Sequence, residues 1–288
     1  MPKTQTGSAV VALVLAAALT GCGNEDGSGK GGDARSGPSA TPPARAVHDA
    51  YRRTVAAGTA RMTVTSKVVA DGQALTGHGS GVADLKDGAS RLSLTSQGTT
   101  IEQRVVDGAV YQKPSGAQRG AVPDGKTWMK IDLARLARKG SAARSQVSDP
   151  AEPVRYLKSV GSEHVTRVAA QTLDGTRTTH YRVTVPVSAL AQGNAGQEQE
   201  LRRQLGKSSL PVDLWLDEQG RMRQESVRLT LHPLKQRTPG HEDAEMTSTT
   251  VLRFKDFGTE AEVTAPPAKD TVDVTDRMTR AGEATGAG

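Results

Sequence analysis

A two-residue alternation of apolar and polar side chains runs through most of the chain between residues 61 and 257. In residues 210–217, for example, every second side chain is Leu or Val, and those between are Pro, Asp and Trp. This period predicts strands with one apolar and one polar face. Such strands belong to antiparallel sheets with one face covered and the other in solvent. The alternation therefore favours an antiparallel sheet and argues against a doubly wound parallel fold.

About ten or eleven strands fit this pattern. Asp107-Gly108 and Asp174-Gly175 each separate two such runs, which is typical of a two-residue hairpin. The strands do not alternate with helices, so we expect an α+β fold in which the helices are segregated from the sheet. The expected strands are 61–70, 75–85, 91–95, 101–106, 109–113, 127–133, 165–173, 176–186, 210–217, 222–231 and 246–257.

Three segments carry helical signals instead. Residues 43–57 repeat apolar side chains every fourth position and are followed by Gly58. Residues 149–160 open with a sequence that resembles a capping box. Residues 188–205 are mostly polar and predict a surface helix interrupted by its glycines. We expect the helices to cover the apolar face of the sheet.

The N-terminus has the composition of an export signal. Ala9–Leu19 is an uninterrupted apolar run, shorter than the roughly 20 residues of a transmembrane helix. The run ends in Leu19-Thr20-Gly21-Cys22, the pattern of a bacterial lipobox, and Cys22 is the only cysteine. We therefore predict a signal peptide over residues 1–21 and lipidation of Cys22 with diacylglycerol and palmitate.

Lipidation at Cys22 would hold the folded part at the extracytoplasmic face of the cell membrane. Two acyl chains, at about 0.8 kcal/mol per buried CH₂, give a stable anchor. The segment after Cys22 is rich in Gly, Ser, Pro and charge, so we expect a disordered tether with a span of roughly 25 Å. The expected organisation is a signal peptide (1–21), a lipidated cysteine with its tether (22–43), a folded domain (44–270) and a frayed polar tail (271–288).

Enzyme signals are weak, and we expect no catalytic residue, no metal site and no cofactor. Gly77-His78-Gly79-Ser80-Gly81 has His where a serine elbow needs Gly, two residues before the serine. No histidine belongs to an HExxH motif, and one cysteine cannot support a cysteine-based zinc site. Asp132, Asp213 and Asp217 lie on predicted polar faces, without the burial that acid–base catalysis needs. Residues 241–243, His-Glu-Asp, are expected in a solvated loop.

The charge pattern leaves two interpretations open. The formal net charge is +6, and the densest basic group lies in residues 133–144. That group indicates either a solvated loop or contact with anionic headgroups. Nucleic acid is not an expected partner, since no stacking aromatics accompany a basic face. Trp128 and Trp215 alternate with charged residues, which indicates an interaction face, packing of the two against each other, or packing under a loop on the convex side.

The ordered set of motifs resembles the actinobacterial LppX/LprG-type lipoproteins, which have a LolA-like fold. The features are the lipobox at Cys22, Val110–Lys113, Lys126–Asp132, Thr179–Val185, Leu210–Arg221, Phe257-Gly258 and Ala265-Pro266-Pro267. The resemblance implies a curved antiparallel half-barrel whose concave face, closed by helices, holds acyl chains. It also implies a function in carrying or presenting lipids or lipoglycans in the cell envelope.

Under this resemblance the apolar face of the sheet would line a ligand cavity. The expected lining residues are Leu92, Leu94, Met129, Ile131, Val183, Leu214, Leu216 and Leu229. A filled core needs the same apolar face, so two functions stay open. One is a lipid-anchored, non-enzymatic lipoprotein that carries a lipid or lipoglycan. The other is a tethered interaction or sensor module with a filled core that docks another envelope protein.

Overall fold

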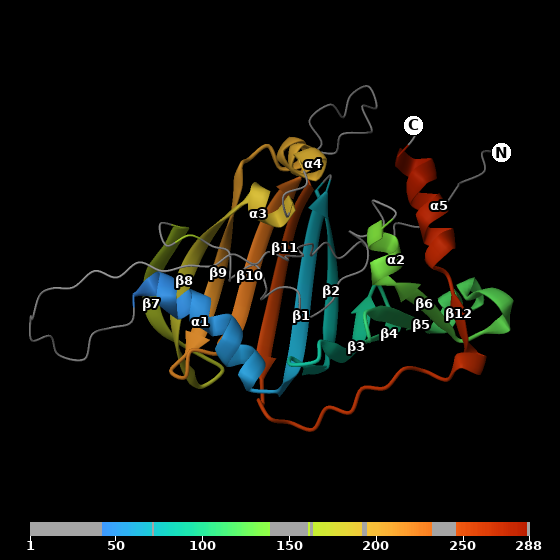
Figure 1. The fold of residues 1–288 in the computed structure, drawn as a ribbon, viewed down its shortest axis with the longest axis horizontal. Coiled ribbons are helices and arrows are strands. Elements are labelled where there is room, and N and C mark those ends of the chain that lie inside the picture. The colour runs from blue at the N-terminus through green and yellow to red at the C-terminus, as the bar shows by residue number, and fades with distance from the viewer. Residues whose placement is uncertain are drawn as a thin grey trace, which may run out of the picture.

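The structure is a computed structural model that describes residues 42–70, 72–138, 161, 164–191, 195–231 and 246–286. Within these residues, twelve strands form one open, curved sheet, antiparallel except for one short parallel pair (Figure 1). The predicted antiparallel α+β fold is confirmed, with one strand more than the sequence indicated. No described helix is both long enough and apolar enough to cross a membrane.

The strands are β1 (Thr59–Ala70), β2 (Gln73–Asp84), β3 (Ala89–Ser96), β4 (Thr99–Val106), β5 (Ala109–Pro114), β6 (Trp128–Asp132), β7 (Val165–Leu173), β8 (Thr176–Pro186), β9 (Ser209–Asp217), β10 (Met222–Leu231), β11 (Met246–Lys255) and β12 (Thr271–Asp273). The described helices are α1 (Pro43–Ala56), α2 (Leu133–Arg138), α3 (Val187–Ala191), α4 (Ala195–Leu205) and α5 (Thr275–Gly286), with short 3₁₀ turns at Gly116–Ala121, Pro123–Gly125 and Ala268–Asp270.

The sheet consists of two runs of antiparallel strands joined at its centre. Its order is β12-β6-β5-β4-β3-β2-β1-β11-β10-β9-β8-β7, so β1 lies between β2 and β11. Both predicted Asp-Gly turns are confirmed. Asp107 and Gly108 have φ values of 51° and 69°, and Asp174 and Gly175 have 48° and 77°. Positive φ at both central residues matches the right-handed twist of the flanking strands.

One face of the sheet, here called the inner face, carries the apolar set and packs against the helices. Alternate residues of a strand share a face, so the register defines which side chains lie together. Phe254, Met62, Gly81, Leu92 and Gln103 are aligned across β11, β1, β2, β3 and β4. The opposite, outer face carries most of the polar and charged side chains of these strands.

Three apolar clusters lie between the inner face and the helices. The first joins Val47 and Ala50 of α1 to β1–β3 and β8–β11, and the second joins Leu136 of α2 to β4–β6. The third joins Val187 of α3 and Leu205 of α4 to β9 and β10. Figure 1 shows the corresponding separation, with α1, α3 and α4 toward the β7 end of the sheet and α2 and α5 toward the β12 end.

Two predictions about the ends of elements were wrong. Residues 271–288 were expected to fray, but β12 pairs in parallel with β6 and α5 follows it. Val272 lies beside Met129, and the two pack at the margin of the second cluster. The strand predicted over 127–133 ends at Asp132, because Asp132 Oδ1 accepts the Arg135 N–H at 2.8 Å and so begins α2.

The helix predictions had mixed outcomes. The N-terminal helix is confirmed as α1, and the polar helix of residues 188–205 is divided into α3 and α4. The helix predicted over 149–160 and the loop of residues 241–243 lie outside the described residues.

An ion pair connects α2 to the C-terminal part of the chain. Arg135 Nη2 is paired with Asp273 Oδ2, and the Thr275 N–H donates to Asp273 Oδ1 at 2.9 Å. Partial burial raises the pKa of the Asp273 carboxyl, but hydrogen bonds from Thr275 and Arg135 outweigh it, and the pKa lies below its ordinary 3.8. The ionised form of Asp273 is therefore favoured by folding.

We expect Asp273→Asn to lower the free energy of unfolding at neutral pH. Because the folded-state pKa of Asp273 is lowered, its contribution is present above the unfolded-state pKa and is lost as pH falls through the folded value. The difference between wild type and variant should shrink below pH 3.8. Urea unfolding at a series of pH values checks this, and a difference that does not change with pH would contradict it.

Candidate ligand-binding face

All eight predicted lining residues lie on the inner face, as the register shows. They are divided among the three clusters and are not gathered at one point. Four of them, at most 4% exposed, belong to the first cluster: Leu92, Val183, Leu214 and Leu216. Ile131 is 2% exposed in the second. Leu94, Met129 and Leu229 are half-buried and pack against the first, second and third clusters respectively.

The first and second clusters meet over β2–β5, at a part of the inner face that we call the seam. Three kinds of residue make it up: glycines without side chains, half-buried apolar residues and two amides. Its residues are Gly77, Gly79, Leu94, Ile101, Gln103 and Gln112. Leu94 and Ile101 are half-buried, in contrast to the fully buried Leu92 beside them. The seam therefore includes apolar side chains of the inner face that remain partly exposed.

Glycine at position 79 determines how closely the seam side chains pack. A Cβ there would lie 2.5 Å from Val64 Cγ1 and 2.6 Å from Leu94 Cδ2. Any side chain would displace Val64 or Leu94, so glycine is required for their present packing. At Gly77 the nearest atom to such a Cβ is 3.8 Å away, so the inner face is more open there. The serine-elbow-like sequence of residues 77–81 is thus a strand whose glycines shape the apolar face.

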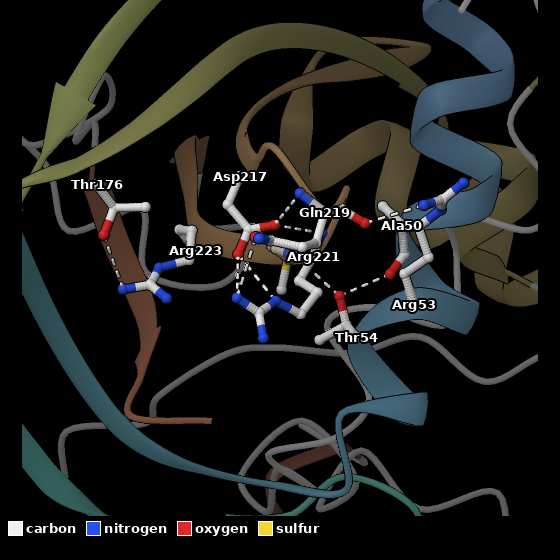
Figure 2. Close-up of polar contacts among 9 residues, drawn as sticks. Ala50, Arg53, Thr54, Thr176, Asp217, Gln219, Arg221 and Arg223 are labelled. Atoms are coloured by element: carbon white, nitrogen blue, oxygen red, sulfur yellow. Dashed lines mark hydrogen bonds and ion pairs between the residues drawn. The ribbon is translucent and has the colours of Figure 1, made fainter. Parts of the chain in front are cut away.

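The helix α1 is fixed over the inner face by a group of contacts that we call the α1 latch (Figure 2). Thr54 is fully buried; its Oγ1 donates to the Ala50 carbonyl at 2.6 Å and accepts the Met222 N–H at 2.8 Å. Arg53 Nη1 donates to the Gln219 carbonyl at 3.1 Å. These contacts join the end of α1 to the turn between β9 and β10.

A buried carboxylate organises that turn. Asp217 Oδ1 accepts the N–H groups of Gln219 at 3.1 Å and Arg221 at 2.9 Å, and Arg221 Nε donates to Oδ2 at 2.9 Å. The Asp217 side chain is 1% exposed, so its predicted place on a solvated polar face was wrong. The Arg221 guanidinium also lies 4.5 Å over the Phe257 ring. Asp217 thus stabilises the turn to which α1 is attached.

The other residues considered as acid–base, metal-ligating or headgroup-binding candidates do not lie together. Asp132 lies in β6 and Asp213 in β9, near opposite ends of the sheet, so these carboxylates do not form a pair. In the described parts of the chain, no three His, Cys, Asp or Glu side chains are placed to hold a metal ion. Of the basic stretch 133–144, Arg135 is paired with Asp273, and the part beyond Arg138 lies outside the described residues.

The two tryptophans lie on the outer face, far apart in the sheet. Trp215 stacks on His180 with ring centroids 4.4 Å apart, and His180 Nε2 lies 2.7 Å from Asp213 Oδ1. Trp128 is 5% exposed under the Arg104 guanidinium, 4.8 Å from the ring centroid. Arg104 in turn donates to the Thr264 carbonyl in the segment between β11 and β12. Of the three interpretations, packing beneath a loop therefore describes Trp128, and the loop is the segment between β11 and β12.

Sequence reasoning missed two polar residues of the seam. Gln103 and Gln112 occupy inner-face positions of β4 and β5, where the alternation calls for apolar side chains. Gln103 is 8% exposed, which makes it one of the few buried polar residues of this face. Both glutamines occupy positions where the two-residue alternation predicts an apolar side chain, and this departure from the pattern could have identified them in the sequence.

No family model matches the chain. It is 26% identical over 271 residues to an uncharacterized 31.2 kDa protein of the rplA–rplJ intergenic region of Streptomyces griseus, covering 85% of this chain and 83% of that protein. It is 27% identical over 304 residues to a Streptomyces coelicolor protein named "Putative lipoprotein SCO4650", covering 94% of each. Among solved structures, lipoprotein LppX of Mycobacterium tuberculosis is similar at 16% identity and a TM-score of 0.45, over 76% of this chain and 98% of that one.

One of these findings agrees with a motif of the sequence. A relative along nearly the whole chain carries the name of a lipoprotein, as the lipobox at Cys22 leads us to expect.

We expect Thr54→Val to weaken the α1 latch. Valine keeps the shape of threonine but removes the acceptor of the Met222 N–H, and leaving a buried donor unsatisfied costs about 1–3 kcal/mol. Urea unfolding should show this loss. Thr63→Val, on the outer face of β1, is the matched control and should change stability by less than about 0.5 kcal/mol. Equal effects of the two variants would show that the latch does not stabilise the fold.

Proposed function

We propose that this protein is a lipid-anchored lipoprotein of the extracytoplasmic membrane face that binds an acylated ligand on the inner face and carries or presents it in the envelope. The observation that carries the proposal is the seam. There the apolar face continues between two clusters, but Leu94 and Ile101 are only half-buried. A long apolar chain that covers such half-buried side chains would replace water there and would add to the apolar contacts of this face.

The energetics of such binding are hydrophobic. At about 25 cal/mol per Å², burial of a few hundred Å² of acyl chain contributes several kcal/mol. No covalent step is needed, and the side chains described above supply no nucleophile with its base. The protein would therefore act as a non-enzymatic binder.

The proposed location rests on two separate observations. The sequence Leu19-Thr20-Gly21-Cys22 has the form of a lipobox, and a relative over 94% of the chain is named as a lipoprotein. Acylation of Cys22 would place the inner face within a tether length of lipid. A ligand could then pass between the membrane and the protein over a short distance.

A second function is favoured by a different observation. Ile131 and Leu216, both expected to line a cavity, are 2% and 3% exposed within packed clusters. Such packing is what a filled core requires. In that case the protein would act as a tethered module that docks another envelope protein.

Cys22→Ser tests the location. The variant should lose incorporation of labelled palmitate and should leave the membrane fraction after carbonate extraction, because no acyl chain remains to anchor it. Ser28→Ala in the same N-terminal segment is the control and should stay acylated. Retention of the Cys22→Ser chain in membranes after extraction would contradict the predicted anchor.

Leu94→Trp tests the ligand. The indole would occupy the space of an acyl chain at the seam, so lipid adducts of the purified full chain in native mass spectrometry should fall by about tenfold or more. Because Leu94 is half-buried, unfolding should change by less than the 1–3 kcal/mol typical of overpacking a closed core. Val168→Trp, at a side chain that is 49% exposed, is the matched control. A wild-type chain without adducts, even with lipid supplied, would favour the docking module.

A further inference from the structure

The two glutamines of the seam form a directed polar contact within an apolar face. Gln112 Nε2 donates to Gln103 Oε1 at 3.2 Å. The pair lies between apolar neighbours in one cross-strand row, since Leu92 is aligned with Gln103 and Met129 with Gln112. It therefore stands where the first and second clusters meet.

This contact leaves most of the hydrogen-bonding capacity of the pair unused. A primary amide offers two N–H donors and one carbonyl acceptor. Among the described residues, neither side-chain amide makes a hydrogen bond other than the one that joins the two glutamines. Gln103 therefore keeps two donors, and Gln112 keeps one donor and its oxygen. The Gln103 residue is 8% exposed, but its free amide nitrogen is not among the buried atoms without a partner. These free groups are therefore accessible to a hydrogen-bonding partner supplied from outside the chain.

The described strands around the pair carry no charged side chain on the inner face. On β1–β6, alternation and register place no Lys, Arg, Asp or Glu on the inner face among the described residues. The cations of these strands, such as Arg91, Arg104 and Lys113, lie on the outer face. An anionic headgroup at the seam would lose its water and find no opposite charge on these strands, which is costly. An ester, amide or hydroxyl needs only the donors and the acceptor that the two glutamines offer.

We propose that Gln103 and Gln112 bind an uncharged hydrogen-bonding group of the ligand, so that the seam selects a neutral acylated lipid over an anionic one. This inference rests on the proposed lipid binding and specifies its ligand class. The Gln103 donors face a carbonyl or hydroxyl oxygen of the lipid, and the Gln112 oxygen accepts from a hydroxyl. The apolar neighbours Leu92, Leu94 and Met129 contact the acyl chains.

A competition experiment on the purified full chain in detergent tests the inference. Equal amounts of dioleoylglycerol, dioleoylphosphatidylglycerol and squalene are offered together, and native mass spectrometry measures the three adducts. These probes represent a neutral lipid with hydrogen-bonding groups, an anionic lipid and a hydrocarbon without either. We expect wild type to favour dioleoylglycerol over both others by about tenfold, the factor that corresponds to about 1.4 kcal/mol.

The decisive variant is the double substitution Gln103→Met and Gln112→Met. Methionine has a similar length and fills the seam, but its thioether is a poor hydrogen-bonding group. The preference for dioleoylglycerol over squalene should disappear, while the squalene adduct stays within about twofold of wild type. Gln171→Met, on the edge strand β7, is the matched control and should keep the wild-type ratio. If the double variant does not fold, Gln112→Met alone tests the same ratio at a half-buried position.

A second test introduces a positive charge at the seam and asks whether the lipid preference changes from neutral to anionic. Gln112→Lys adds a cation beside Gln103 and should shift the adducts from dioleoylglycerol toward dioleoylphosphatidylglycerol by about tenfold. Equal binding of the three probes by wild type, an unchanged ratio in the methionine variants, or no shift with lysine would overturn the role of the amides and leave lipid binding intact. Absence of all three adducts from wild type would instead overturn the proposed function itself.

Discussion

The pairing of β1 with β11 is the constraint on which the rest of the structure depends. Apart from β12, each half of the sheet is a series of antiparallel pairs between strands that are neighbours in sequence, whereas β1 and β11 come from opposite ends of the fold. Their register runs from Arg61 with Lys255 to Ala70 with Met246. It aligns apolar side chains from both halves into one face. A slip by one residue would move one strand's apolar set to the outer face, and the clusters beneath the helices would lose their shared surface.

The inner face contains closed apolar clusters and, between them, the seam where we propose that a ligand binds. Toward the ends of the sheet, helices convert it into closed clusters, and the α1 latch connects one of these helices to a turn built around the buried Asp217 carboxylate. Between the clusters, the glycines of β2 and the amides of β4 and β5 replace bulky apolar side chains. The most fully buried apolar side chains thus lie in the clusters on either side of the seam.

The sequence predicted well those features that depend on local pattern. Strand positions follow from alternation, and the Asp107-Gly108 and Asp174-Gly175 turns follow from the backbone freedom of these residues. The shared face of the eight predicted lining residues follows from the same period. Features set by distant contacts were missed: β12 is a three-residue strand that depends on β6, and Asp217 is buried because its own turn folds back over it. The alternation also could not predict how the apolar face is divided into clusters and a seam. That division depends on which helices cover each part of the face, and those helices lie far apart in the chain.

The central position of β1 affects the order in which its two strand pairs can form during folding. β1 and its neighbour β2 are adjacent in sequence and can pair early, whereas β11 lies about 190 residues further along the chain. One edge of β1 therefore stays open until this long-range pair forms. An open edge is a site of wrong pairing with other chains. Arg61 and Lys67, on the outer face of β1, place positive charge along that edge and oppose such pairing until the last long strand arrives.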